Sequence, residues 1–409
     1  MSQLEHGSTR ERLLAEAARS FNSVGVGQAS MAKIAQQAGV SRATVYYYFD
    51  DQQDLVFQCY RRTYELMADS LSKASAEHEN TMSAIESFVR GMLGDGDIEF
   101  AALSETAFLH PDQRDTILEL NRAIRTDLAK LLVVGLQRDE VRPCNSEIVA
   151  QTVLGLVCWV PIARRWSTSG SLSHRDLVEA IIAILQEGVA ADRSLGDEYL
   201  TITPTPGSVA AVNIFNPQEL SMARREALLV SASWLFNLKG VDATSLDEVA
   251  ERVGVTRKVV YNNLGDKETV VIESYRRAFR FYEDVGLRAL QTEGPRINAI
   301  CASTQALCES NLREDLAPLA PLGGLDTLPA EVRDEIQDAS MRLRNSYITL
   351  YGRGREDGSV RDIPVRAVLA VLPGLSQWLP KWLDILTDKE RAAAPREIAD
   401  LIRTGLRPL

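Results

Sequence analysis

The sequence predicts an all-α protein built from two similar units in one chain. Apolar residues recur at helical spacing in nearly every segment, and few segments alternate with a period of two. The 409 residues exceed the ~100–200 residues of one ordinary domain. Residues 30–49 also match residues 245–264 without a gap, at an offset of 215. A duplication of a complete helical domain accounts for all three observations.

The repeat reaches both ends of each unit. The N-terminal matches are Phe21 with Phe236, Gly25 with Gly240, Gly39 with Gly254, Arg42 with Arg257 and Tyr46 with Tyr261. Near the far ends, Gly155 and Trp159 match Gly374 and Trp378 at an offset of 219, which a loop longer by four residues explains. The period is far longer than the ~20–50 residues of a solenoid repeat, so the two units are two domains, each of them complete.

The helical pattern divides both units similarly. In the first unit we expect helices over 9–23, 30–38, 42–48, 52–77, 81–93, 98–109, 112–138, 145–165 and 173–192. In the second we expect them over 218–238, 245–253, 257–263, 267–291, 296–311, 329–356, 363–384 and 388–406. Several begin at residues that cap helices well, namely Ser30, Ser41, Ser173, Ser245 and Thr256.

Residues 30–49 predict a short helix, a turn and a second short helix. Val45 and Phe49 are four residues apart and face the core together with Ile34. Gly39 stands where the chain leaves the first helix, a position that commonly needs positive φ. The second helix therefore exposes an arginine and tyrosines, the arrangement of a helix-turn-helix that reads the major groove of DNA.

The segment "IAQQAGVSRATVYYYFDDQQDL", with "AARSFNSVGVGQAS" before it, resembles the DNA-binding head of the TetR family of bacterial transcriptional regulators. The segment "VAERVGVTRKVVYNNLGDKETVV" after "SASWLFNLKGVDATS" resembles it too. The resemblance implies five parts: head one (1–62), body one (63–192), a linker (193–217), head two (218–280) and body two (281–409). The helical bodies match the family's ligand-binding and dimerisation domain in character, without a diagnostic motif.

The resemblance also implies contacts to DNA at matching positions. Tyr46 and Tyr261 match a tyrosine that contacts phosphate, and Arg42 and Arg257 match positions that reach guanine or phosphate. The full set that we expect at DNA is Ser30, Ser41, Arg42, Thr44, Tyr46, Tyr47, Tyr48, Ser245, Thr256, Arg257, Lys258, Tyr261, Asn262 and Lys267. The family's phosphate-binding lysine is present as Lys267, whereas head one has Gln52 at that position.

The net charge of −11 opposes DNA binding only for the molecule as a whole. Head one carries seven Lys and Arg against six Asp and Glu, and head two carries ten against nine. The excess negative charge lies outside the two heads, so it argues only weakly against DNA binding by the heads themselves. Because each head is nearly neutral, we expect few phosphate contacts per head.

TetR-like proteins pair two heads through their last two helices as homodimers. The counterparts here are 145–192 and 363–406, both rich in Val, Leu, Ile and Trp. We therefore expect the chain to form an intramolecular pseudo-dimer. Because Thr44 and Tyr47 in head one stand opposite Val259 and Asn262 in head two, we expect a non-palindromic operator. The alternative is a homodimer of chains with four heads.

The sequence contains no evident catalytic apparatus. Neither a Gly-x-Ser-x-Gly motif, a phosphate loop nor a metal-spaced histidine pair occurs, so we expect no enzyme, metal or cofactor. Five scattered cysteines suit a reduced cytoplasmic protein, and we expect no membrane span. Four tryptophans are candidate ligand contacts or, alternatively, interface residues: Trp159, Trp166, Trp378 and Trp382.

The most economical interpretation is a ligand-responsive transcriptional repressor that binds double-stranded DNA and an unidentified small-molecule effector. A second hypothesis is a scaffold in which one degenerate head supports the fold without binding DNA. An enzyme would need an unexpected cofactor in the purified protein to become a serious candidate.

Overall fold

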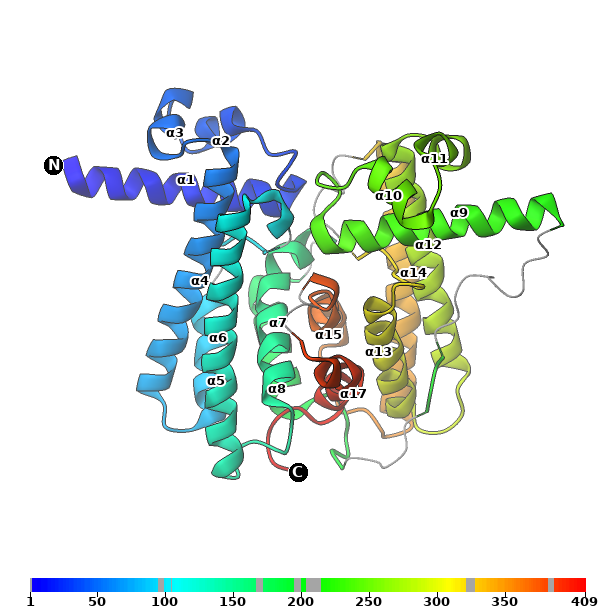
Figure 1. Ribbon diagram of the computed structural model, residues 1–409. Coiled ribbons are helices and arrows are strands. Elements are labelled where there is room, and N and C mark those ends of the chain that lie inside the picture. Colours follow the sequence, from blue (N-terminus) through cyan, green and yellow to red (C-terminus); the bar gives the residue numbers. More distant parts are fainter. Residues whose placement is uncertain are drawn as a thin grey trace.

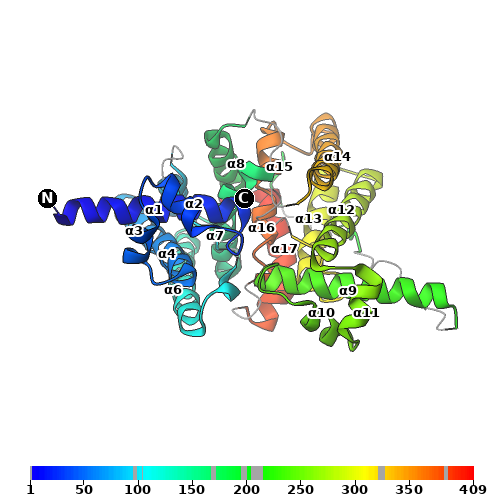
Figure 2. The same cartoon turned by 90° about the horizontal axis from the view of Figure 1, so that it is seen from above.

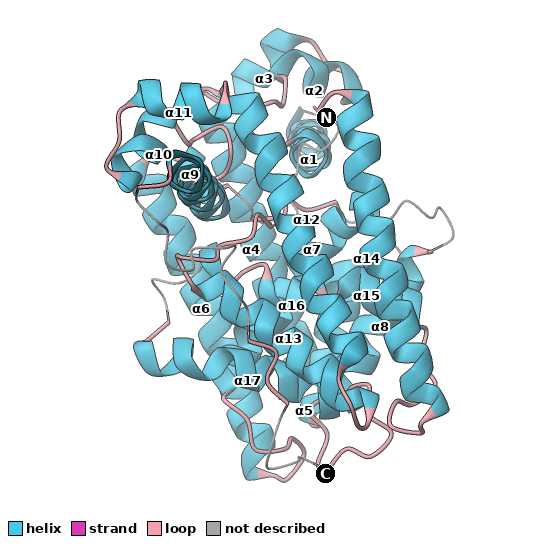
Figure 3. Ribbon diagram, turned by 90° about the vertical axis from the view of Figure 1, so that its right-hand side faces the viewer, coloured by secondary structure: helices cyan, strands magenta, loops and turns pink. Residues whose placement is uncertain are grey.

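The computed structural model describes the backbone of residues 2–94, 99–103, 105–166, 172–194, 200–203, 215–320, 328–381 and 386–409. Figure 1 shows two helical units side by side, each with a head at the same end and a body of longer helices beneath it. Within the described residues the fold is all-α, as Figure 3 shows, and the β-type pairing in them is one bridge between Ala190 and Val360.

The helices of the two units follow the same order. The first unit has α1 (Ser2–Val24), α2 (Met31–Gln37), α3 (Arg42–Tyr48), α4 (Gln52–Glu77), α5 (Thr81–Leu93), the 3-10 helix η1 (Thr106–Phe108), α6 (Pro111–Gln137), α7 (Ser146–Trp166) and α8 (His174–Glu187). The second has α9 (Pro217–Lys239), α10 (Leu246–Val253), α11 (Arg257–Leu264), α12 (Lys267–Gln291), α13 (Arg296–Leu312), α14 (Ala330–Glu356), α15 (Val365–Val371), α16 (Pro373–Ser376) and α17 (Asp388–Thr404). Most of the helices expected from the sequence are confirmed.

Four expected helices are wrong in extent. The helix expected over 9–23 is α1, which begins seven residues earlier, at Ser2. The helix expected over 363–384 is broken into α15 and α16 at Pro373, whose ring cannot continue the regular hydrogen bonding. The helix expected over 173–192 ends at Glu187, before Gly188 with its positive φ of 64°. The helix expected over 98–109 is reduced, among its described residues, to η1.

The absence of helix in residues 99–103 has a physical cause. Asn22, which is 4% exposed, donates to the carbonyl of Phe100 and accepts from the amide of Ala102, both at 2.8 Å. Thr63 donates to the carbonyl of Ala101. These side chains use the backbone groups that a helix would need, because buried backbone groups must be paired.

The same hydrogen-bonded connection between head and body occurs in the second unit. Asn237 donates to the carbonyl of Pro318 and accepts from the amide of Ala320, again both at 2.8 Å. Arg62 donates to the carbonyl of Glu99 at 2.8 Å, and its counterpart Arg277 donates to the carbonyl of Leu316 at 2.6 Å. Each head is thus fastened to its body by a buried asparagine and an arginine that the duplication has kept.

The two units pack through their last helices. In Figures 1 and 2, α7 and α8 lie beside α15, α16 and α17 between the two bodies. Gly155 on α7 faces Gly374 on α16: a Cβ on Gly155 would lie 2.6 Å from the Gly374 carbonyl oxygen, and one on Gly374 would lie 3.2 Å from the Gly155 oxygen. Equivalent glycines therefore allow equivalent helices to cross at van der Waals contact.

The hydrogen bonds of this interface are reciprocal. The Val189 amide donates to the Ile402 carbonyl at 2.8 Å, and the Leu406 amide donates to the Leu185 carbonyl at 2.8 Å. These four residues occupy matching places around Gly188 and Gly405, the glycines that end α8 and α17. Reciprocity of this kind is the property of an isologous interface with two-fold symmetry.

One helix of the described chain is long and apolar enough, by length and composition alone, to cross a membrane. It is Ser146–Ala163 in α7, and two thirds of it is buried inside the protein, as expected of a core helix.

Candidate DNA interface and effector cavities

Each recognition helix, α3 or α11, has a buried side; α3 also has a side-chain cap, whereas Thr256 before α11 makes no capping hydrogen bond within the described residues. Val45 and Phe49 are at most 1% exposed, and in head two Val260 and Leu264 are at most 3% exposed. Ser41 accepts a hydrogen bond from the Thr44 amide and so caps α3. Gly39 and Gly254 both have positive φ, 69° and 72°, as the turn before each recognition helix requires.

The outward side of each recognition helix carries the same arginine–tyrosine pair. Arg42 Nη2 donates to Tyr46 Oη at 3.2 Å, and Arg257 Nη2 donates to Tyr261 Oη at 2.9 Å. Each guanidinium also lies over the ring of its tyrosine, 5.5 and 5.3 Å from the centroid. The hydrogen bond to the tyrosine raises the pKa of both guanidinium groups, so both stay charged.

Most residues expected at DNA are exposed. Tyr47 is the most exposed tyrosine of the set at 73%, and the others in the exposed class are Ser30, Ser41, Arg42, Tyr46, Ser245, Thr256, Arg257, Lys258, Tyr261 and Asn262. Three are half-buried: Thr44, Tyr48 and Lys267. Thr44 shares a hydrogen bond with Ser41, and Tyr48 packs edge-on against Tyr47. These two therefore support the exposed side chains beside them.

Lys267 and Gln52 perform the same internal task. Lys267 Nζ donates to the Asp242 carbonyl at 3.2 Å, and Gln52 Nε2 donates to the carbonyls of Val26 and Ala29 at 2.7 and 3.1 Å. Each side chain ties the first turn of α12 or α4 to the loop before the helix-turn-helix. Glutamine in head one thus keeps the loop in place without the lysine's charge.

The two heads touch each other. Gln28 donates to Asp242 at 3.1 Å, and a Cβ on Gly27 would clash with the Asp242 side chain. Gly27 and Asp242 are equivalent in the repeat, so this contact lies close to the pseudo-symmetry axis. In Figure 1, α3 and α11 both lie at the head end of the molecule.

Head two has a carboxylate beside its recognition helix that head one lacks. Asp247 on α10 pairs with Arg257 at 3.1 Å, and both side chains are more than half exposed. The equivalent of Asp247 in head one is Ala32. Arg257 therefore shares its charge with a carboxylate that head one lacks.

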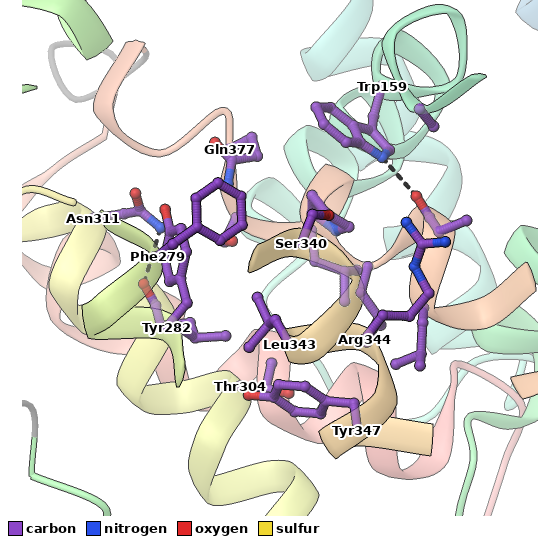
Figure 4. A pocket seen from close by; sticks show the side chains of 18 residues that line it. Trp159, Phe279, Tyr282, Thr304, Asn311, Ser340, Leu343, Arg344, Tyr347 and Gln377 are labelled. Carbon is purple, nitrogen blue, oxygen red and sulfur yellow. Dashed lines mark hydrogen bonds between the residues drawn. The ribbon is translucent and has the colours of Figure 1, made fainter. Parts of the chain in front are cut away.

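Body two encloses the larger cavity, about 190 Å³ in volume (Figure 4). Its walls come mainly from α12, α13, α14, α15 and α16, and they include Phe279, Leu307, Leu343 and Leu369. Asn311 is 1% exposed, and among the described residues its side-chain oxygen has no hydrogen-bond partner. An apolar cavity with a few polar atoms is the usual composition of a small-molecule site.

Arg344 is the charged residue in the wall of this cavity. Burial lowers the pKa of its guanidinium, and the nearby Arg366 lowers it further. The duplication relates Arg344 to Arg125, and Arg366 to Glu147. In body one Arg125 and Glu147 form an ion pair at 3.5 Å, so the second unit has replaced a carboxylate with a cation.

Body one contains a smaller cavity of about 60 Å³. It is lined from body one by residues of α4, α6 and α7 and from the second unit by Gln377, Trp378 and Lys381. Each body's cavity thus includes residues of the other unit, because Trp159 and Ala163 of α7 line the larger one.

The tryptophans expected at a ligand have different outcomes. Trp159 lines both cavities and Trp378 lines the smaller one, and both are buried between the units. Both are therefore interface residues that also line a cavity, and their contact with a ligand stays a prediction. The side chain of Trp166 and the whole of Trp382 lie outside the described residues. Arg344 and Lys381 were missed, although the comparison at offset 219 places Arg366, beside Arg344, opposite Glu147 and Lys381 opposite Ile162.

The chain matches two family models. The model described as bacterial regulatory proteins, tetR family, matches residues 13–59 and 228–273. The model described as tetracyclin repressor-like, C-terminal domain, matches residues 76–189. A fatty acid metabolism regulator protein of Bacillus subtilis is 22% identical over 138 residues, which are 32% of this chain and 71% of that protein.

Solved structures are similar to less than half of the chain. The TetR family regulator PfmR of Thermus thermophilus is 26% identical, covering 45% of this chain and 97% of its own, with a TM-score of 0.36. The regulator FadR of Bacillus subtilis, solved with stearoyl-CoA, is 17% identical, covering 42% and 95%, with a TM-score of 0.32.

Proposed function

The chain belongs to the tetR family of bacterial regulatory proteins, and on that premise we propose that it is a cytoplasmic transcriptional repressor. It binds an asymmetric operator through two unlike heads that are paired within one chain. The observation that carries this proposal is the duplicated pair Arg42–Tyr46 and Arg257–Tyr261, exposed at the same end of the molecule.

Pairing within one chain replaces dimerisation. Helix-turn-helix proteins bind two half-sites roughly 34 Å apart, and a covalent link holds the second head at an effective concentration of about 1 mM or more. The reciprocal bonds around Gly188 and Gly405 keep the two units in a fixed relation. We expect one chain to occupy one operator, and light scattering of the complex tests this. A complex of two chains with four heads would contradict it.

The two heads present different chemistry to the bases. Head one offers Thr44 and Tyr47, whereas head two offers Val259 and Asn262. Asparagine reads adenine through paired hydrogen bonds, and valine makes only apolar contacts such as those to a thymine methyl group. Selection of bound sequences from a random duplex library is expected to return two unlike half-sites. A palindromic consensus would refute the asymmetric operator.

Alanine substitutions test whether both heads bind. Tyr46→Ala and Tyr261→Ala should each cost about 1–3 kcal/mol of DNA-binding free energy, since each removes a phosphate contact. Met341→Ala removes an exposed side chain of body two and serves as the control. Affinity unchanged by Tyr261→Ala would favour the scaffold hypothesis, in which head two does not touch DNA.

The larger cavity suits an effector with an apolar tail and an anionic end. Phe279, Leu307 and Leu343 provide apolar walls, and Arg344 with Arg366 provides positive charge at one side. The curated relative is a fatty acid metabolism regulator, which agrees with such an effector. Binding releases DNA if the effector prefers a head arrangement that does not match the operator.

Decanoate and decanol, used below their aggregation limits, separate the anionic end from the tail. Decanoate should displace operator DNA in a fluorescence anisotropy titration, and decanol should be at least tenfold weaker. Arg344→Met should remove this difference. If both compounds act equally on the unmodified protein, the effector is not recognised by its charge.

A further inference from the structure

The smaller cavity of body one has a polar wall. The side chains with polar oxygen or nitrogen atoms that line it are Tyr64, Asn121, Gln151, Trp159, Gln377, Trp378 and Lys381. Gln151 and Trp378 are 2% and 4% exposed. The Gln151 Oε1 and Trp378 Nε1 atoms have no hydrogen-bond partner among the described residues. Buried polar atoms are normally paired, so an acceptor and a donor left over in one cavity indicate a missing polar molecule.

The duplication supplies an internal comparison. On the other side of the pseudo-symmetry axis, Trp159 Nε1 donates to the Ala370 carbonyl at 2.8 Å (Figure 4). Trp378 is the counterpart of Trp159, and Gln151 is the counterpart of Ala370. The equivalent bond is not made in body one, where the indole N–H remains unpartnered within the described chain. The two cavities have therefore diverged from one ancestral site.

Lys381 is the largest departure between the two halves. Its counterpart at offset 219 is Ile162, so an ammonium group has taken the place of an apolar side chain. Burial lowers the pKa of Lys381 to about 8, and the attraction of Glu105 acts in the opposite sense. The second unit thus introduces a cation into the cavity of the first.

Glu105 connects this lysine with the heads. Its Oε1 atom accepts a hydrogen bond from the Val26 amide at 3.2 Å, in the loop of head one. Its side chain also lies against Gly240 in the corresponding loop of head two, where a Cβ on the glycine would be 3.0 Å from Glu105 Cγ. The same carboxyl group therefore contacts the loops of both heads and attracts Lys381.

We propose that the smaller cavity binds a small organic carboxylate, held by Lys381, Gln151 and Trp378 at a site that both units build. The ligand's carboxylate forms an ion pair with the ammonium of Lys381 and accepts a hydrogen bond from the indole N–H of Trp378. A hydroxyl or amide of the ligand donates a hydrogen bond to Gln151. That this cavity is a second effector site rests on the proposed function. The bound anion competes with Glu105 for Lys381, and because Glu105 contacts the loops of both heads, binding acts on those loops.

The cavity volume limits the size of the ligand. A water molecule needs about 10–15 Å³ of such space, so about 60 Å³ holds roughly four to six non-hydrogen atoms. Acetate, glycolate and lactate cover this range, and the last two carry the hydroxyl that donates to Gln151. Glycolamide and lactamide match these two in size and keep the hydroxyl but lack the charge, so they isolate the contribution of Lys381.

The experiment is isothermal titration calorimetry of the full chain with these five compounds. At least one carboxylate should bind, and its matching amide should bind at least tenfold more weakly. Lys381→Ile, which copies Ile162, should weaken the carboxylate at least tenfold. Trp378→Phe keeps a ring and removes the N–H, and it should weaken binding three- to tenfold. Lys389→Ile removes an exposed lysine of α17 and should leave binding unchanged.

Three results would overturn the proposal. These are no binding of any carboxylate at millimolar concentration, equal binding of acid and amide, or equal binding to the unmodified chain and Lys381→Ile. Trp378→Phe keeps the test decisive if Lys381→Ile does not fold. Binding is measured without DNA, so a failure here leaves operator binding intact. Conversely, loss of operator binding refutes the proposed function while the calorimetry still decides on the site.

Discussion

The crossing of α7 and α16 makes a prediction that can be worked out from the structure. In Gly155→Ala the new Cβ would lie 2.4 Å from Trp378 Cδ1 and 2.6 Å from the Gly374 carbonyl oxygen. The oxygen belongs to a backbone and cannot turn away, so the helices must separate. Overpacking of this kind costs about 1–3 kcal/mol, against a gain of roughly 0.5–1 kcal/mol from replacing a helical glycine.

Gly352→Ala is the matched control. Gly352 also lies inside a helix, α14, and a Cβ added to it would have no described atom within 4 Å. This variant should gain the roughly 0.5–1 kcal/mol of helix propensity without a clash. The difference in unfolding free energy between the two variants is therefore the cost of the clash, about 1–3 kcal/mol.

Thermal unfolding measures this difference. For units of about 200 residues each kcal/mol corresponds to about 2–4 °C, so Gly155→Ala should melt roughly 2–12 °C below Gly352→Ala. Gly374→Ala should resemble Gly155→Ala, because it meets the same contact from the other side. If Gly155→Ala is as stable as Gly352→Ala, the units do not pack closely at this crossing and the paired arrangement is refuted.

Three further outcomes are expected. Asn237→Ala leaves the Pro318 carbonyl and the Ala320 amide without their buried partner, so it should lower the unfolding free energy measured by chemical denaturation by about 2–5 kcal/mol. A loss below about 1 kcal/mol would contradict this connection between head and body. The pKa of Lys381 is about 8 in the folded chain, below the ordinary value of 10.5, so the unfolded state binds more protons between these values and stability rises with pH there. Relative to Lys381→Ile, the unmodified chain should therefore gain stability as the pH rises from 8 to 10.5, and parallel melting curves over this range would refute the burial of the ammonium. Asp247→Ala removes the carboxylate beside Arg257, so it should tighten operator binding two- to fivefold with little change in melting temperature, since exposed pairs contribute at most about 1 kcal/mol; weaker operator binding would show that the pair orients the arginine.

The sequence alone determined the parts of this protein that depend on local spacing. Val45 and Phe49, four residues apart, fix which side of α3 is buried and therefore that Arg42 and Tyr46 face outward. Gly39 marks the turn, and Ser41 marks the start of the helix. Because these signals act within a few residues, the heads and most helices could be predicted from them.

Tertiary structure alone decided the cavities and the irregular course of residues 99–103. Residues 100–103 are apolar and look helical, but Asn22 and Thr63, which lie on helices distant in the sequence, hydrogen-bond to their backbone groups. Lys381 reaches body one only because the interface brings the segment that follows α16 across the symmetry axis. Such features depend on which surfaces meet after folding, and periodicity along a chain carries no information about that.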